Sequence, residues 1–365
     1  MDRRSFLAAS AVLPLASSLP ASAWAQDRSF APRPGQWRTF EIVTRLEIAD
    51  AGGGTQAWVP VPAVDAGWQQ SLDSTWTGNA AEAALRTDPV YGARMVQARF
   101  AADEKSPVIE VTSRVRTQSR SLDWAARRAA SADAATLALY TRATDLMPTD
   151  GIVRETAQKA TDGKTTDVDR VRALYDWVVA NTYREPKVRG CGVGDIKAML
   201  ETGNMGGKCG DINALFVGLC RASGIPARDV YGIRVAKSAF GYRELGAGGP
   251  DISKAQHCRA EVWLADYGWV AMDPADVGKV LRLETPDWLK DTAHPVAAPV
   301  NSALFGGWEG NWMAYNVAHD VALPGSRGPR VAFLMYPQAE TRGERVDSLD
   351  PETFKYRITA REITA

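Results

Sequence analysis

The chain has 365 residues, of which 45% are hydrophobic and 24% are charged. This apolar content is enough to fill a core, which excludes an intrinsically disordered or low-complexity protein. At about 150 residues per domain, the length predicts about two domains. The 43 Lys and Arg residues balance 43 Asp and Glu residues, and the lack of a basic excess argues against nucleic acid as a partner. The chain holds three His and four Cys, so the search for nucleophilic or metal chemistry is short.

Residues 1–25 have the pattern of an export signal. Arg3 and Arg4 precede an apolar run from Phe6 to about Leu19, and Ala23-Trp24-Ala25 is typical of a cleavage site. The run is shorter than the roughly 20 residues that a membrane-spanning helix needs. The paired arginines resemble a twin-arginine signal, with an ordinary secretory signal as the alternative. We therefore expect the twin-arginine export machinery as a partner, and a periplasmic or secreted mature protein without a membrane anchor.

Residues 35–125 are predicted to form an N-terminal module of the β-sandwich type. The segment from Phe40 to Ile48 alternates apolar and polar residues with the period of two that strands have. Further strand-like runs are Thr55 to Val61, Val96 to Phe100 and Val108 to Val115. The module holds no Cys or His, so we expect no chemistry in it.

Residues 131–285 are predicted to form a core of helices followed by strands. Thr166 is typical of a helix N-cap. The apolar face of the helix that follows is made by Val171, Leu174, Tyr175 and Val178. Residues 286–365 are predicted to be a C-terminal β extension, in which 331–336 and 355–358 are the clearest strands.

A strong amphipathic helix is predicted to begin at Cys209. A flexible Gly206-Gly207-Lys208 turn precedes it, and Gly224 and Pro226 end it. Its apolar face is made by Ile212, Leu215, Phe216, Leu219 and Cys220. A helix N-terminus presents free N–H groups and partial positive charge, which lower the pKa of a thiol and stabilise an oxyanion. Cys209 is therefore the candidate nucleophile.

His257 begins a predicted strand, and Asp273 ends the next one. A hairpin folded about Ala265 would set these two side chains opposite each other on one face. The turn residues 266–268 lie slightly later, so this match needs a bulge or a longer loop. Acyl-transfer chemistry needs a nucleophile, a base and a group that orients the base. The predicted elements supply a thiol at a helix start, an imidazole on a strand and a carboxylate on the adjacent strand.

With these residues the sequence resembles the transglutaminase-like superfamily. The matching positions are 207–211, 215–216, 221–228, His257, Glu261, 268–270 and Asp273-Pro274, with 175–183 as the preceding helix. The resemblance covers about residues 135–280 and implies an α+β fold with a papain-like core. It also implies Cys209 as nucleophile, His257 as general base and then acid, and Asp273 as the residue that orients His257. Arg259 departs from the family pattern, where an aromatic residue is common.

The resemblance implies ping-pong acyl transfer on an amide bond, with a thioester on Cys209. Water as the second substrate makes the enzyme a peptidase or amidase, and an amine makes it a transamidase. We expect an exported peptide, protein or cell-wall amide as substrate. Beside the Cys209 amide, Asn204 and Tyr183 are weak candidates for the second oxyanion donor. The alternatives are an inactive module of the same fold that binds peptide or cell-wall material, and a redox protein, against which the lack of a CxxC pair argues.

The remaining cysteines and histidines have structural interpretations. Residues 190–195 form a glycine-rich segment that we interpret as a shaped loop near the site, and its Cys191 has a disulfide to Cys258 as an alternative. His294 and His319 are interpreted as loop or surface residues. No CxxC or HxxxH spacing occurs, so no metal and no cofactor are expected.

Overall fold

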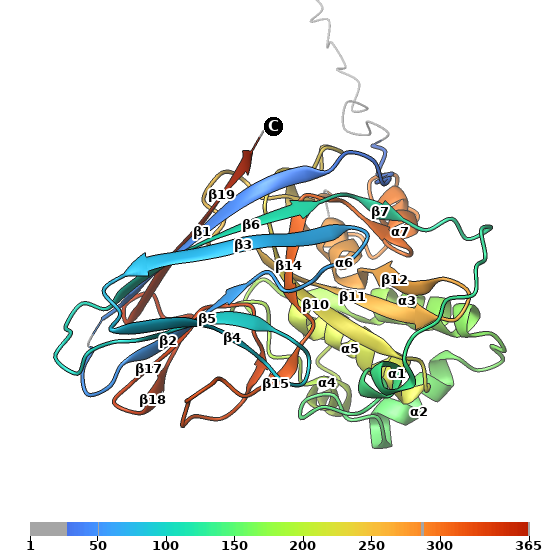
Figure 1. Cartoon of the computed structure of the whole chain (residues 1–365). Helices are drawn as coiled ribbons and strands as arrows, with labels where there is room; N and C mark the ends of the chain where they lie inside the picture. Colours follow the sequence, from blue (N-terminus) through green and yellow to red (C-terminus); the bar gives the residue numbers. More distant parts are fainter. Residues whose placement is uncertain (1–27, 50, 286–287, 364–365) are drawn as a thin grey trace, which may run out of the picture.

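The computed structural model describes residues 28–49, 51–285 and 288–363. Figure 1 shows a β-sandwich on the left of the view and a sheet covered by helices on the right. The predicted signal at 1–25 lies outside the described residues. Among the helices of the described segments, none combines the length and the apolar character needed to cross a membrane.

The sandwich is built from two antiparallel sheets. Its strands are β1 (Arg38–Ile48), β2 (Gln56–Val61), β3 (Gln69–Gly78), β4 (Glu82–Thr87), β5 (Arg94–Arg99), β6 (Val108–Thr117), β17 (Gln338–Thr341), β18 (Glu344–Val346) and β19 (Phe354–Ile363). One sheet has the order β19-β1-β6-β3 and the other has the order β18-β17-β2-β5-β4. The predicted alternation of β1 is confirmed, because every second residue from Phe40 to Ile48 is buried. The strands β3 and β4 were not predicted, since both are mostly polar or half-exposed.

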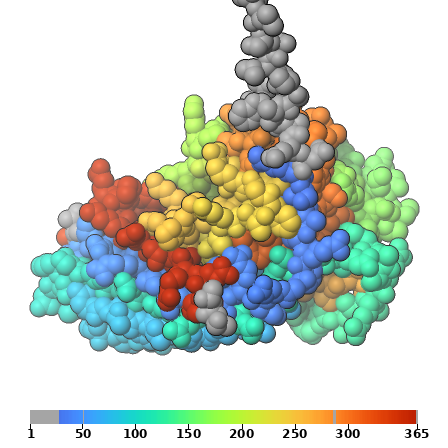
Figure 2. All heavy atoms as spheres, turned by 90° about the horizontal axis from the view of Figure 1, so that it is seen from above, coloured from blue at the N-terminus to red at the C-terminus, as the bar shows by residue number. Residues whose placement is uncertain are grey.

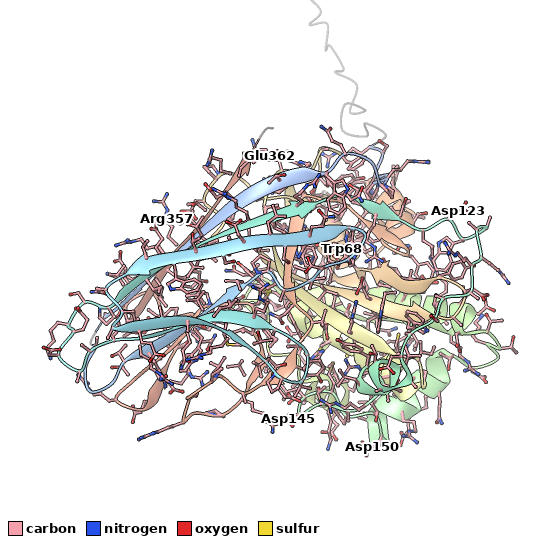
Figure 3. All side chains as sticks on the ribbon, in the orientation of Figure 1. Trp68, Asp123, Asp145, Asp150, Arg357 and Glu362 are labelled. Atoms are coloured by element: carbon pink, nitrogen blue, oxygen red, sulfur yellow. The ribbon has the colours of Figure 1, made fainter. Side chains whose placement is uncertain are left out.

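The first and last strands of the described residues pair in this sandwich. β19 pairs with β1 over ten residues, from Thr39 with Ile363 to Ile48 with Phe354. A bidentate ion pair between Arg38 and Glu362 (the latter labelled in Figure 3), at 2.8 and 2.7 Å, joins the same two strands. Figure 1 shows β1 and β19 side by side, and Figure 2 shows blue and red atoms next to each other on the surface. From sequence, these two segments were expected as separate parts.

The other half of the molecule is a four-stranded antiparallel sheet with helices. Its strands are β10 (Ala227–Arg234), β11 (Gln256–Leu264), β12 (Gly268–Met272) and β14 (Trp312–Asn316), in the order β12-β11-β10-β14. The helices are α1 (Ala134–Leu139), α2 (Gly151–Ala160), α3 (Asp167–Asn181), α4 (Ile196–Thr202), α5 (Cys209–Ala222), α6 (Pro274–Leu283) and α7 (Ala298–Ala303), with a 3-10 turn η1 (Arg243–Leu245). Short two-stranded pairings are β7 (Arg120–Ser121) with β13 (Gly307–Trp308), β8 (Tyr183–Arg184) with β9 (Gly206–Gly207), and β15 (His319–Val321) with β16 (Val331–Phe333). The predicted α+β class is confirmed.

The helix α5 is the centre of this half. Every residue from Cys209 to Arg221 is buried, so the helix is enclosed on all sides rather than on one amphipathic face. It packs on β10 and β11 and against α2, α3 and α6. The predicted cap of α3 is confirmed, because Thr166 accepts a hydrogen bond from the Asp169 N–H at 3.1 Å.

Aromatic and amide side chains join the two halves. Gln69, at the start of β3, bonds both the N–H and the C=O of Ala314 in β14, at 2.7 and 2.8 Å. Trp68 (Figure 3) packs edge-on against Trp308, with ring centroids 5.1 Å apart. The segment 306–312 includes two tryptophans, Trp308 and Trp312, that are each 1% exposed. It belongs to the core because it lies where the sandwich meets the sheet.

We predict that Phe354→Ala lowers the free energy of unfolding of the whole chain by about 3–5 kcal/mol, because it opens a cavity in the sandwich core. Arg357→Ala, on the same strand but with a side chain that is 68% exposed, is the control and is expected to cost about 1 kcal/mol or less. Chemical denaturation measures both. Equal small losses would show that β19 contributes little to the folded unit.

Candidate active site

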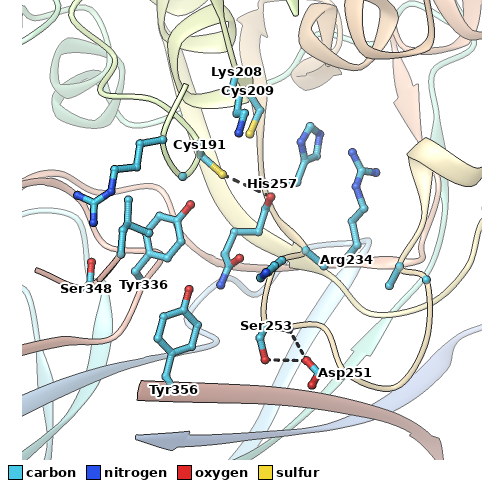
Figure 4. Close-up of a pocket in the computed structure, with 18 of the residues that line it drawn as sticks. Cys191, Lys208, Cys209, Arg234, Asp251, Ser253, His257, Tyr336, Ser348 and Tyr356 are labelled. Carbon is cyan, nitrogen blue, oxygen red and sulfur yellow. Dashed lines mark hydrogen bonds between the residues drawn. The ribbon is translucent and has the colours of Figure 1, made fainter. Parts of the chain in front are cut away.

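A cavity of about 720 Å³ lies between the start of α5, the start of β11 and the strand β19 (Figure 4). Cys209 and His257 both line it, together with residues of β19 such as Tyr356. Asp273 does not line the cavity and lies behind His257. The junction of two packed units is a common place for a ligand site.

Cys209 is the first residue of α5 and is 3% exposed. The N–H of Gly210 donates to the Cys191 carbonyl at 2.8 Å. None of the hydrogen bonds found in the described residues uses the Cys209 N–H. This donor at the positive end of the helix is available to an oxygen atom that lies beside the thiol.

The carboxylate of Asp211 fixes the start of α5. It accepts hydrogen bonds from the backbone N–H groups of Lys208, Val193 and Gly194, at 2.9, 2.8 and 2.9 Å. The loop 190–195 thereby wraps around the helix start, as the shaped loop predicted from its glycines. Gly192 has a φ of +95°, and a Cβ there would lie 1.8 Å from an oxygen of Asp211. This close approach explains why the loop needs glycine.

Three of the four cysteines meet at this point. The sulfur atoms of Cys191, Cys209 and Cys258 lie within 4.8 Å of one another, and all are free thiols. Hydrogen bonding from Cys191, and then from Cys258 and His257, holds the pKa of Cys209 well below its usual range despite burial. The same bond to Cys209 raises the pKa of Cys191. Cys209 is therefore the thiol of this cluster that carries the negative charge.

His257 is held by two carboxylates. Its Nε2 lies 2.7 Å from Oδ2 of Asp273 and 3.3 Å from Oδ2 of Asp276. Burial and the nearby Arg234 lower the pKa of His257, but Asp276 and Asp273 outweigh them and raise it to about 9. Because Nε2 faces the carboxylates, Nδ1 is the ring nitrogen left for a reacting group.

Asp273 reaches His257 from the start of α6, which its side chain caps by accepting the Asp276 N–H at 3.2 Å. The hairpin pairs Leu264 with Gly268 and is therefore centred on residue 266, not on Ala265. The expected pairing of His257 directly opposite Asp273 is wrong, since the register brings Asp273 alongside Arg259. The contact still forms because strand residues two apart lie on the same face.

Arg259, where the resemblance led us to expect an aromatic residue, is not part of the cavity wall. Its guanidinium lies over the rings of Trp308 and Trp312, at 5.2 and 4.7 Å from their centroids. Its Nε lies 3.6 Å from Oδ2 of Asp273. An arginine at position 259 therefore adds positive charge next to Asp273 and not on the cavity wall.

Several other sequence expectations have clear outcomes. Asn204 and Tyr183, the candidates for the second oxyanion donor, do not line the cavity. His294 lies in a loop and accepts the Val296 N–H at 3.2 Å. The interpretation of His319 as a loop or surface residue is wrong, because it is 4% exposed in β15 and bonds the Tyr231 hydroxyl at 3.2 Å.

Three residues of the site were missed from sequence. Asp276 bonds Arg234 at 2.6 Å as well as approaching His257. Asn213 donates to the Cys258 carbonyl at 2.8 Å and to Asp273 at 3.3 Å. The Asp-Pro start of α6 could have indicated Asp276, since residues three apart share a helix face. Nothing local indicates Arg234 or Asn213.

The fold and this cluster define a cysteine-based protein with a papain-like core. Residues 154–274 match the family model described as the transglutaminase-like superfamily. The chain is 34% identical over 328 residues to an uncharacterized protein of Haemophilus influenzae, covering 85% of this chain and 87% of that protein. The chain belongs to the same family as this relative, and its residues 154–274 are similar to the transglutaminase-like superfamily.

A solved structure with the same fold is known at low sequence identity. A crystal structure of a candidate cysteine protease from Cytophaga hutchinsonii has a TM-score of 0.55 and 15% identity, and covers 91% of this chain and 92% of that one. The periplasmic domain of TgpA from Pseudomonas aeruginosa has a TM-score of 0.34 and 16% identity, over 67% of this chain and 90% of that one.

We predict that Gly192→Ala disrupts the start of α5. The positive φ costs about 1 kcal/mol, and displacing the Asp211 carboxylate from its backbone donors costs about 1–3 kcal/mol more. Gly54→Ala is a matched control, because Gly54 has a φ of +94° with no atom within 4 Å of an added Cβ. Chemical denaturation should show the larger loss for Gly192→Ala, and equal losses would contradict the role given to Asp211.

We predict that Asp276→Asn lowers the pKa of His257. The raised value of about 9 means that His257 is protonated at lower pH and loses its proton as the pH rises through 9. Asp276 is the carboxylate that raises this pKa most. Removing its charge therefore shifts the titration of His257 to lower pH. NMR titration can follow it, since the chain has three histidines. The buried His319, whose pKa burial lowers, is the internal control, and an unmoved His257 transition would refute the assignment.

Proposed function

We propose that the chain is an exported thiol acyl-transfer enzyme that acts on amide bonds through a thioester on Cys209. The observation that carries this proposal is the shared cavity. Cys209 lies in it at an unoccupied helix N–H, and His257 lies in it with its far nitrogen held at 2.7 Å by Asp273. This is the set of groups that nucleophilic acyl transfer needs.

In the first half-reaction, the Cys209 thiolate attacks the amide carbonyl carbon. The carbonyl π electrons move to oxygen, where the Cys209 N–H donates to the oxyanion. The imidazolium of His257 gives its proton to the leaving nitrogen as the C–N bond breaks, which leaves a thioester on Cys209 and neutral His257. Asp273 and Asp276 favour the protonated form of His257 at the start of this step.

In the second half-reaction, neutral His257 takes a proton from the acceptor as the acceptor attacks the thioester. The C–S bond then breaks and restores the thiolate–imidazolium pair. Water as acceptor gives hydrolysis and an amine gives transamidation. Exposed side chains such as Lys254 and Lys355 line the cavity, so it opens to solvent, and this supports hydrolysis as the main outcome.

We predict that Cys209→Ala lowers amide turnover by about 10³-fold or more, because no thioester can form. Cys220→Ala is the matched control, since Cys220 lies on the same helix, is fully buried and does not line the cavity. The assay presents a peptide library with and without an amine acceptor, and mass spectrometry identifies products and the acyl-enzyme.

Undiminished activity in Cys209→Ala would refute the proposed mechanism. Saturable binding of peptide or cell-wall fragments by the wild-type protein, without turnover and without labelling of Cys209 by a thiol reagent at neutral pH, would support the inactive binding module instead.

A further inference from the structure

The cavity at Cys209 is strongly basic although the chain as a whole is neutral. Seven of its lining side chains are Lys or Arg, and of the described residues that line it only Asp251 is acidic. The full sequence has 43 residues of each sign. The excess of positive charge is therefore a property of this surface and not of the composition.

Three of these seven cations already have carboxylate partners. Arg189 pairs with Asp347 at 2.6 Å, Arg234 with Asp276 at 2.6 Å, and Lys279 with Glu244 at 3.3 Å. The other four, Arg184, Lys208, Lys254 and Lys355, form no ion pair within the described part of the chain. These four can accept an anion without breaking an internal contact.

Two of the four lie on the backbone segments around the start of α5, where Cys209 lies. Lys208 is the N-cap of α5, directly before Cys209. Arg184 lies in β8, whose parallel register with β9 sets it beside Gly207. Burial, and then the nearby Arg184 guanidinium, lowers the pKa of Lys208, so the two cations are close enough to repel each other. A carboxylate placed between them would remove this repulsion.

The other two lie on segments away from the thiol. Lys254 precedes β11 and Lys355 belongs to β19. Their neighbours Ser253 and Tyr356 are at the end of the cavity opposite Cys209 in Figure 4. All four of these cations line this one cavity from different segments of its wall, which suits an extended ligand with more than one carboxylate.

We propose that the amide substrate is an acidic peptide, with a carboxylate close to the scissile bond that Lys208 and Arg184 bind. This inference rests on the proposed acyl transfer at Cys209. It adds the substrate class, because the three proposed catalytic residues do not by themselves select for the charge of the substrate. The carboxylate belongs either to an Asp or Glu side chain or to a free peptide C-terminus.

The experiment compares peptides that differ only in charge. Pairs with Glu or Gln beside the scissile bond, and pairs with a free or amidated C-terminus, separate the two sources of the carboxylate. We expect kcat/KM to be about 10-fold or more higher for the charged member of one pair, and the advantage to shrink as salt is added.

Variants test the two cations. Lys208→Met and Arg184→Gln should each reduce the ratio of kcat/KM between the charged and neutral peptide. Lys187→Gln is the control, because Lys187 is an exposed lysine of the same segment that does not line the cavity. Equal turnover of charged and neutral peptides by the wild-type protein, or a ratio that both variants preserve, would overturn the proposal.

Failure of the proposed function gives a different result. If no peptide is turned over in a Cys209-dependent way, the same peptide pairs are titrated into the Cys209→Ala protein and binding is measured by calorimetry. Tighter binding of the charged peptide, lost with Lys208→Met, supports the charge preference by itself. Equal binding of both members overturns it.

Discussion

The site depends on one buried carboxylate, that of Asp211. Three backbone N–H groups converge on it, from the residue before Cys209 and from the loop that carries Cys191. A buried carboxylate is costly unless its oxygens are satisfied, so its position can change only if the loop moves with it. This requirement sets the start of α5, and with it the thiol, the available N–H and the neighbouring sulfur atoms.

Behind the Cys209 thiol, a buried network of charged side chains sets the protonation state that His257 favours. Asp273 caps α6 and Asp276 lies in its first turn, and Arg234, Arg259 and His257 surround them. Burial and its neighbour Asp276 raise the pKa of Asp273, whereas Arg234 and His257 hold the pKa of Asp276 well below its usual range. The full negative charge of Asp276 thus favours the imidazolium, while Asp273 makes the shorter contact that orients the ring.

The β-sandwich takes part in the site as well as supporting it. β19 is the edge strand that pairs with β1. Its first residues, Phe354, Lys355 and Tyr356, line the cavity. β19 therefore forms the wall of the cavity opposite Cys209. A segment far away in sequence thus supplies one of the cavity's cations, Lys355.

The sequence by itself determined the local elements and the three candidate residues. The period of β1, the cap at Thr166 and the glycines before Cys209 are patterns among neighbouring residues, and the order of Cys209, His257 and Asp273 is read along the sequence. Only the tertiary structure decided how distant segments meet. Asp276 and Arg234 come together across α6 and β10, Cys191 and Cys258 come together at Cys209, and β19 reaches the cavity from the far end of the chain. Periodicity and capping act over a few residues, whereas these contacts depend on how buried surfaces pack, which no local pattern records.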